Sequence, residues 1–176
     1  TFGPSSIVQF DLVQRGYLVP ESMYIRYKLT TTLPTNATAG TALKATPVYT
    51  LISRLETIVG SQVVESIQNY NQLSNMLVNC KMNYAQKVGL ASAFGYSGNG
   101  SSVDYAFDFA SDAPNGLCFL TSTAANAIGA NVFLAAPLGC ILSNADNLVP
   151  LKFMPSCRIQ LTTETLGNAY NGSGTT

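Results

Sequence analysis

The segment from Ser22 to Thr32 alternates between apolar and polar residues, which is the pattern of a β-strand with one buried face. One set of alternate positions is apolar and consists of Met23, Ile25, Tyr27 and Leu29. The other set consists of Tyr24, Arg26 and Lys28. We therefore predict a strand that packs its apolar face on a core and exposes its charged face.

Other segments repeat this period of two or form short apolar runs between turn residues. Three alternate clearly: Val8 to Leu12, Val103 to Phe109 and Cys157 to Thr163. Less regular runs predict further strands at 48–59, 117–121, 132–136 and 140–142. Gly60-Ser61 separates residues 57–59 from 62–64, and glycine at the first central position favours a type II′ hairpin turn.

One stretch changes to helical spacing. Its apolar positions are Ile67, Tyr70, Leu73, Leu77 and Cys80, with Met76 beside them. Its polar positions are Gln68, Asn69, Gln72 and Asn75, which we expect to face solvent. We predict a helix of two or three turns over an open end of the sheets, and the less regular residues 83–94 predict another helical turn.

About eight short strands and a single helical insertion predict an all-β protein, an eight-stranded jelly-roll β-sandwich with a short helical insertion. An immunoglobulin sandwich fits less well, because the chain has no Trp and so lacks the Cys-Trp-Cys arrangement. We expect one jelly-roll domain at 1–166. The Gly/Asn/Ser/Thr-rich residues 167–176 predict a flexible tail or a linker to a further domain. Residues 33–46 and 95–102 are expected loops.

The composition narrows the range of functions that the chain can have. The chain has 176 residues, 9 basic and 9 acidic side chains, 47% hydrophobic residues and no His. Without His, imidazole-based catalysis and His metal ligation are excluded. Only 10% of residues are charged, against roughly 25% in an average soluble protein. A surface with so few charges predicts that much of it is buried against neighbouring copies. The alternative is a secreted or structural domain with hydroxyl-rich faces.

The ends of the chain and its cysteines add further expectations. No apolar stretch approaches the roughly 20 residues of a membrane helix. The chain begins without Met and without a signal peptide, which predicts a processed product or a piece of something longer. Two disulfides, in three possible connectivities, could join the four cysteines, but we expect buried free thiols. These cysteines are Cys80, Cys118, Cys140 and Cys157, and the absence of a CxxC pair argues against zinc.

Several segments, taken in order, resemble the first jelly roll of double-jelly-roll major capsid proteins, the lineage of adenovirus hexons and of virophage, polinton-like virus and large DNA virus capsids. The resemblance extends from about Ile7 to Glu164 and has no catalytic signature. The segments that carry it are Tyr17-Leu18 with Ser22–Leu29, Ser53–Glu65, the helical positions Ile67, Tyr70-Asn71, Leu73 and Met76-Leu77, then Phe133–Leu142, Val149–Leu151 and Arg158–Leu161.

The resemblance implies a structural virion protein that self-assembles into an icosahedral shell inside the host cell. Its partners would be other copies of itself, as trimers or pentamers, and other capsid proteins, with no small-molecule substrate and no cofactor. Loops 33–46 and 95–102 would be exposed, and the helix near Ile67–Cys80 would contact another subunit. A double jelly roll needs roughly twice this length, so the chain would be its N-terminal half or a single-jelly-roll capsid or penton protein.

The acidic residues offer weak candidates for chemistry. Glu56 and Glu65 lie on the two arms of the predicted hairpin and could form an acid/base pair. We favour exposed strand charges or partners for Arg54. Asp104 and Asp108 share a strand face, where a solvated surface is favoured over a calcium site. Asp112 and Asp146 are expected in turns.

Other motifs give no specific site either, so we predict no catalytic, cofactor-binding or metal-binding residue and no enzyme activity. Gly95, Gly98 and Gly100 lack the Lys-Ser/Thr of a phosphate-binding loop. Arg26 and Lys28 form a basic pair, but zero net charge argues against nucleic-acid binding. Asn-X-Ser/Thr patterns begin at Asn36, Asn99 and Asn171, and we interpret them as chance matches.

The alternative function is a carbohydrate-binding or host-attachment jelly-roll module. Exposed aromatic rings could stack on sugars, and the candidates are Tyr17, Tyr24, Tyr96, Tyr105 and Tyr170. A hydrolase on the same fold ranks third, because the chain has no His and no clustered carboxylates.

Overall fold

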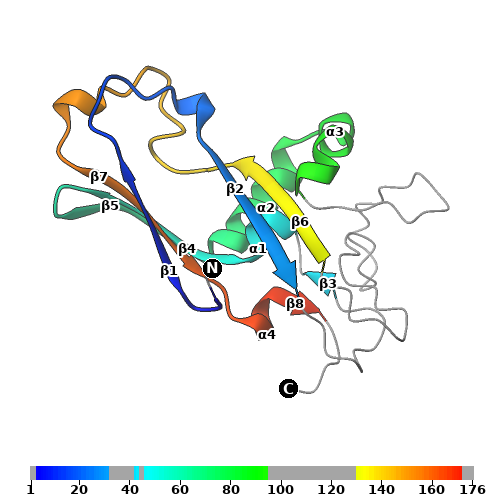
Figure 1. The fold of residues 1–176 in the computed structure, drawn as a ribbon. Coiled ribbons are helices and arrows are strands. Elements are labelled where there is room, and N and C mark those ends of the chain that lie inside the picture. The colour runs from blue at the N-terminus through cyan, green and yellow to red at the C-terminus, as the bar shows by residue number, and fades with distance from the viewer. Residues whose placement is uncertain (1–2, 32–41, 44–45, 95–129, 172–176) are drawn as a thin grey trace.

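The computed structural model describes residues 3–31, 42–43, 46–94 and 130–171 (Figure 1). These residues form three antiparallel sheets with several helices. Sheet A has four strands in the order β1-β7-β4-β5, namely Ile7–Leu12, Cys157–Thr163, Ile52–Val59 and Gln62–Gln68. Sheet C pairs β2 (Tyr24–Thr31) with β6 (Ala130–Pro137), and the two-residue strands β3 (Ala42–Leu43) and β8 (Tyr170–Asn171) pair with each other.

A long double ribbon connects sheets A and C. The outgoing arm, residues 7–31, runs antiparallel to the returning arm, residues 130–163. In sheet A, Ile7 lies opposite Thr162, and in sheet C, Tyr24 lies opposite Pro137. Between the sheets the arms are joined by a two-way bridge, in which Leu18 and Val149 exchange N–H···O bonds of 2.8 and 3.0 Å. The two arms, which are far apart in the sequence, therefore lie side by side in both sheets.

The core lies between the facing surfaces of sheets A and C. Leu55, Ile159 and Leu161 bury their side chains from sheet A, and Leu134 and Ala136 do so from β6. The apolar face predicted for residues 22–32 is confirmed, since Met23, Ile25, Tyr27 and Leu29 pack against this core. Tyr24, Arg26 and Lys28 are exposed, as predicted.

Three helices are tied to the core by aromatic rings: α1 (Pro47–Thr50), α2 (Tyr70–Lys81) and α3 (Tyr84–Phe94). Tyr49 of α1 lies 6.0 Å from the ring of Tyr70 and 6.1 Å from that of Phe94, measured between centroids. The Tyr49 hydroxyl donates to Pro137 O at 2.8 Å, and the Tyr70 hydroxyl accepts from Gly139 N at 2.9 Å. These bonds hold the helices against the end of β6.

The predicted helix exists, but its start and its buried face differ from expectation. Ile67 and Gln68 still pair with Leu55 and Arg54 in sheet A, so the helix begins only at Tyr70. Its buried residues are Tyr70, Ser74 and Val78, one helical face at a spacing of four. The expected apolar face was wrong in part, because Met76, Leu77 and Cys80 are exposed. Asn75, expected in solvent, is half-buried and hydrogen-bonded to Thr46.

The strand predictions at 48–59 and 140–142 need correction. Pro47 starts the helical turn α1, in which the Thr50 hydroxyl donates to Thr46 O, and the strand begins at Ile52. Residues 140–142 form a turn held by Ser143, whose hydroxyl bonds both Cys140 N and Cys140 O at 2.9 Å. By contrast, the hairpin is confirmed, with Val59 opposite Gln62 and Gly60 at φ 63°.

The described residues contain six strands of six or more residues and two strands of two residues, arranged as an antiparallel β-sandwich with helices. The expected strands at 103–109 and 117–121 and the loop at 95–102 lie outside the described residues. Of the expected loop 33–46, Ala42–Leu43 forms β3. The start of the expected tail is structured, since residues 167–169 belong to α4 (Leu166–Ala169) and Tyr170–Asn171 pair with β3. None of the described helices is long and apolar enough to span a membrane.

Core burial predicts a clear contrast between two leucines. Leu55 is fully buried on β4, so Leu55→Ala should lower the free energy of unfolding by about 2–5 kcal/mol through lost burial and a residual cavity. Leu148→Ala removes the same atoms from an exposed side chain and should cost less than about 0.5 kcal/mol. Urea denaturation of both variants measures the difference, and equal losses would contradict the described core.

The buried tyrosines predict a loss of stability in alkali. Burial raises the pKa of Tyr49 and of Tyr70 above the ordinary value of 10.0. Above pH 10 the unfolded chain releases these protons while the folded chain keeps them. These two tyrosines should therefore leave the free energy of unfolding unchanged below that pH and lower it progressively above it. Urea denaturation between pH 8 and pH 12 should show this fall, and Tyr49→Phe should make it shallower. A stability that stays level up to pH 12 would show that these hydroxyls are not buried.

Candidate functional site: the exposed apolar surface and the face of sheet A

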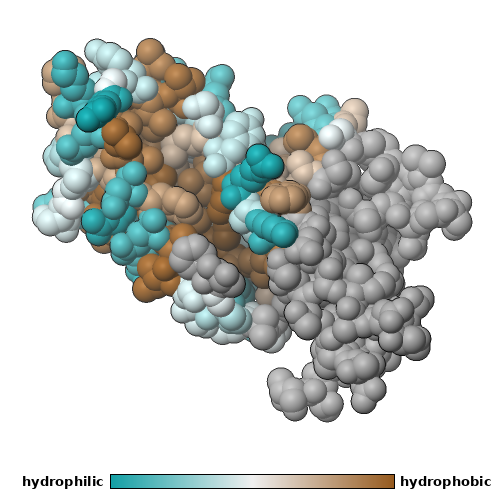
Figure 2. Space-filling view, viewed as in Figure 1, coloured by the Kyte–Doolittle hydropathy of each residue, from teal (hydrophilic) through white to brown (hydrophobic). Residues whose placement is uncertain are grey.

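Large apolar side chains gather at the end of the molecule where the double ribbon crosses from sheet A to sheet C. Figure 2 shows brown surface at the upper left, over the β1–β2 and β6–β7 connections. We call this set the loop-end patch. Its members are Val13, Tyr17, Val19, Leu148 and Phe153, and Phe153 is 74% exposed. Clusters of exposed apolar side chains are typical of interaction surfaces, so we treat this patch as a candidate site.

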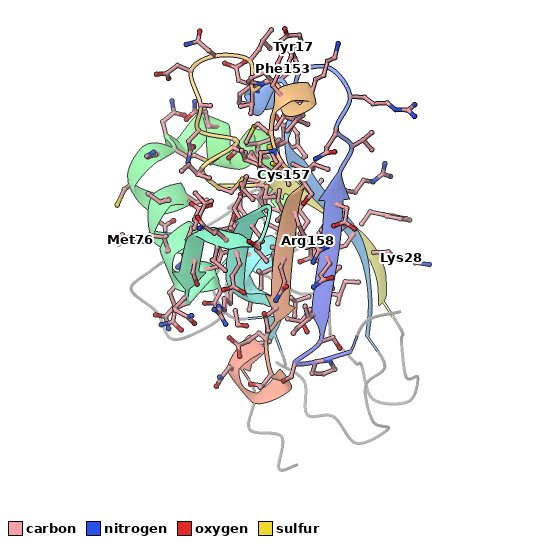
Figure 3. All side chains as sticks on the ribbon, turned by 90° about the vertical axis from the view of Figure 1, so that its left-hand side faces the viewer. Tyr17, Lys28, Met76, Phe153, Cys157 and Arg158 are labelled. Carbon is pink, nitrogen blue, oxygen red and sulfur yellow. The ribbon has the colours of Figure 1, made fainter. Side chains whose placement is uncertain are left out.

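The main chain fixes this patch. Gly16 adopts φ 76°, a turn that glycine tolerates, and its carbonyl accepts from Lys152 N at 3.2 Å. The short helix η2 (Leu151–Phe153) then places Phe153 beside Tyr17, as Figure 3 shows at its upper end. Sequence reasoning singled out Tyr17 as an exposed candidate and missed the other four members, Val13, Val19, Leu148 and Phe153. The available signal was apolar residues within turn-like segments, since Phe153 lies between Pro150 and Pro155.

A continuous polar ladder crosses the outer face of sheet A, the face turned toward the viewer in Figure 3. Gln9 of β1 donates to Gln160 of β7 at 2.9 Å, and Gln160 donates to Glu56 of β4 at 3.4 Å. Glu56 also accepts from Ser66 of β5 at 3.3 Å and from Arg54. The ladder therefore joins all four strands through side chains that are mostly uncharged.

Glu56 and Glu65 do not form a carboxylate pair. Glu56 belongs to the outer face of sheet A and is the ion-pair partner of Arg54, one of the roles expected for it, although it is buried rather than exposed. Glu65 accepts from the Thr57 hydroxyl and from Ile141 N, both at 2.9 Å. Because neighbouring strand residues point to opposite faces, Glu56 and the Thr57–Glu65 pair lie on different sides of the sheet.

The basic pair predicted on β2 lies over an aromatic ring. The Arg26 guanidinium is 5.5 Å and the Lys28 ammonium 5.9 Å from the centroid of Phe133 on the paired strand β6. Cations in these positions interact with the ring face. Tyr24 is exposed on the same outer face of sheet C. This surface combines two positive charges with two exposed aromatic rings.

The cysteines differ from expectation at one position. Cys140 and Cys157 are buried free thiols, as predicted, and burial raises the pKa of Cys157. Cys80 was expected to be buried but is exposed on α2. Cys118 lies outside the described residues. Within those residues, no group of three His, Cys, Asp or Glu side chains is placed to hold a metal ion.

The remaining candidate site residues do not form a common site within the described residues, or lie outside those residues. Asp146 is exposed in a turn region. Tyr17 and Tyr24 are exposed, but Tyr17 belongs to the loop-end patch and Tyr24 to the outer face of sheet C. Candidates outside the described residues are Asp104, Asp108, Asp112, Gly95, Gly98, Gly100, Tyr96, Tyr105, Asn36 and Asn99. For Tyr170 and Asn171, the structure describes only the backbone pairing.

The polar ladder predicts that Glu56 is more important for stability than Asp11, although each carboxylate forms an ion pair. Glu56→Ala leaves Arg54, Ser66 and Gln160 without a shared acceptor, and should lower the free energy of unfolding by about 1–3 kcal/mol. Asp11→Ala is the control. Its exposed bond to Arg158, at 2.7 Å, should contribute less than about 1 kcal/mol. Chemical denaturation compares them, and a larger loss for Asp11→Ala would contradict the ladder.

Comparisons with known proteins identify a shared fold. No family model and no curated protein matches the sequence. Among solved structures, the chain is similar to a chain of the "PBCV-1 virus capsid, quasi-atomic model", with a TM-score of 0.56 and 14% sequence identity. The match covers 94% of this chain and 32% of that one. The two chains therefore share the β-sandwich fold, and this chain spans about a third of the other's length.

Proposed function

We propose that this chain is a jelly-roll unit of a virion capsid and that its role is structural rather than catalytic. The observation that carries the proposal is the similarity of fold, over 94% of the chain, to a chain of a virus capsid. The expected residence is the virion, after assembly inside the host cell. The partners are other copies of the chain, in trimers or pentamers, and other capsid proteins.

The winding of the double ribbon supports an eight-stranded jelly roll. In a jelly roll, the chain folds as a long antiparallel ribbon that curls into two packed sheets. Here β1 pairs with β7, Leu18 with Val149 and β2 with β6, in one nested series. The expected strands at 103–109 and 117–121 would complete the two sheets. They remain predictions.

The surface supports association between copies. The loop-end patch exposes two aromatic and three aliphatic side chains, and α2 exposes Met76 and Leu77. Burial of such side chains is the main favourable term in protein association. The chain has 9 basic and 9 acidic residues and no net charge, so long-range repulsion between copies is small. These features favour a role in which shape and apolar burial hold copies together.

Assembly of the purified protein tests the proposal. We expect discrete oligomers in sedimentation velocity and larger regular assemblies by electron microscopy. Replacing Tyr17 and Phe153 together by Ser should reduce assembly, because both rings are exposed in the loop-end patch and contribute little to the core. Lys152→Ser, in the same exposed segment, is the control and should assemble like the wild type. A monomer at all concentrations, absent from purified particles, would contradict the proposed function.

The mass of the intact protein in purified particles separates two forms of the proposal. A mass of about twice 18.7 kDa or more would identify the chain as one roll of a double-jelly-roll shell protein. A mass that matches 18.7 kDa would identify a single-jelly-roll protein, as at a capsid vertex. Denaturing mass spectrometry of the particles gives this answer directly.

A further inference from the structure

We propose that the outer edge of β1, which no described strand covers, pairs with β1 of a second copy, antiparallel about a two-fold axis at Gln9, so that sheet A continues from one copy into the next. This inference rests on the proposed function, because it names one contact by which copies would associate in the capsid. Its physical basis is independent of the capsid comparison: it follows from the backbone, the side chains and the register of β1.

The backbone of β1 leaves alternate groups unpaired within the described residues. Sheet A begins with β1, and no described strand pairs with its outer side. Thr163 N donates to Ser6 O at 2.9 Å, and Ser6 N donates to the Thr163 hydroxyl at 2.7 Å, so Ser6 and Thr163 occupy a hydrogen-bonded position of the ladder. Such pairs alternate with non-hydrogen-bonded ones along an antiparallel ladder. Ile7, Gln9 and Asp11 therefore direct their N–H and C=O groups away from β7.

The two edge strands of sheet A differ in how well they are protected against pairing with another strand. The opposite edge strand, β5, has an irregular register next to Thr57, and its Glu65 carboxylate binds Ile141 N. Irregularities and covering loops are ways to block edge pairing, as are Lys and Pro. The β1 sequence, IVQFDL, has neither Lys nor Pro and keeps one register along its whole length. Its single charge, on Asp11, is paired with Arg158 at 2.7 Å.

The side chains of β1 suit pairing with a copy of themselves. With Gln9 opposite Gln9 of the second copy, Phe10 lies opposite Val8 of that copy on the core side of the sheet. Phe10 is 48% exposed although it points to the core side, so an added strand would cover apolar surface at the rim of the core. Apolar pairs across antiparallel strands are stabilising.

The outer face of the sheet fits the same register. Gln9 already donates to Gln160 at 2.9 Å, so two Gln9 side chains at the axis would connect the polar ladders of both copies. Ile7 would lie opposite Asp11 of the second copy, whose carboxylate is engaged by its own Arg158. A two-fold contact needs a self-complementary surface, and β1 is self-complementary at positions 8, 9 and 10.

A proline at position 9 tests the contact at the axis. Gln9→Pro removes the outward N–H, and with it both hydrogen bonds of the symmetric pair, while the β1–β7 bonds, made by residues 6, 8, 10 and 12, are kept. We expect the dimer dissociation constant to rise about tenfold or more in sedimentation equilibrium of the whole protein. Gln9→Ala keeps the N–H and is the matched control, with an expected change of less than about threefold. Equal dimerisation of Gln9→Pro and Gln9→Ala would overturn the proposal.

A photo-crosslinking residue at position 9 gives a second readout that does not depend on how the proline variant folds. Cross-links from position 9 to residues 7–11 of another copy are expected. Cross-links to a different protein or to another part of the chain would overturn the proposal. If the protein forms shells but position 9 gives no cross-link to residues 7–11 of another copy, the edge contact is overturned. The proposed capsid role is then unaffected. Position-9 cross-links in a simple dimer that forms no shell and is absent from particles would support the contact and reject the capsid role.

Discussion

The main-chain hydrogen bonds between residues 7–31 and 130–163 are the constraint on which the rest of the structure depends. They place β1 beside β7 in one sheet and β2 beside β6 in the other. The Leu18–Val149 bridge keeps the arms paired where they change sheet. The core, the loop-end patch and the polar ladder of sheet A each take residues from both arms. Without this pairing, Tyr17 and Phe153 would have no reason to be neighbours.

The distribution of polar groups follows from the same pairing. The outer face of sheet A holds two ion pairs, Arg54–Glu56 and Asp11–Arg158. Gln9, Gln160, Glu56 and Ser66 also satisfy one another there across four strands. Within the described residues, the buried Arg54 Nε is the side-chain polar atom that lacks a partner. A charge-poor chain can therefore present a well-ordered polar face on one side and expose apolar groups at its loop end.

The sequence predicted local patterns better than long-range ones. Alternation at residues 22–32 identifies a strand and its buried face, because each step of one residue changes the side of the sheet. Spacing alone did not identify the buried face of α2. Tyr70 bonds Gly139 and Asn75 bonds Thr46, and both partners lie far from α2 in the sequence. The polar ladder likewise could not be predicted from local patterns, because its residues come together only through the register of β1, β7, β4 and β5.

The separation of the two arms along the sequence has a consequence for how the chain folds during synthesis. Thr163 donates its backbone N–H to the carbonyl of Ser6, 157 residues earlier, so β1 emerges from the ribosome long before its partner exists. At about 5–20 residues per second, the wait lasts roughly 8–30 seconds. Both edges of β1 are open during that time. Nascent copies on neighbouring ribosomes are therefore exposed to premature strand exchange, and a chaperone that shields the first arm would favour correct closure.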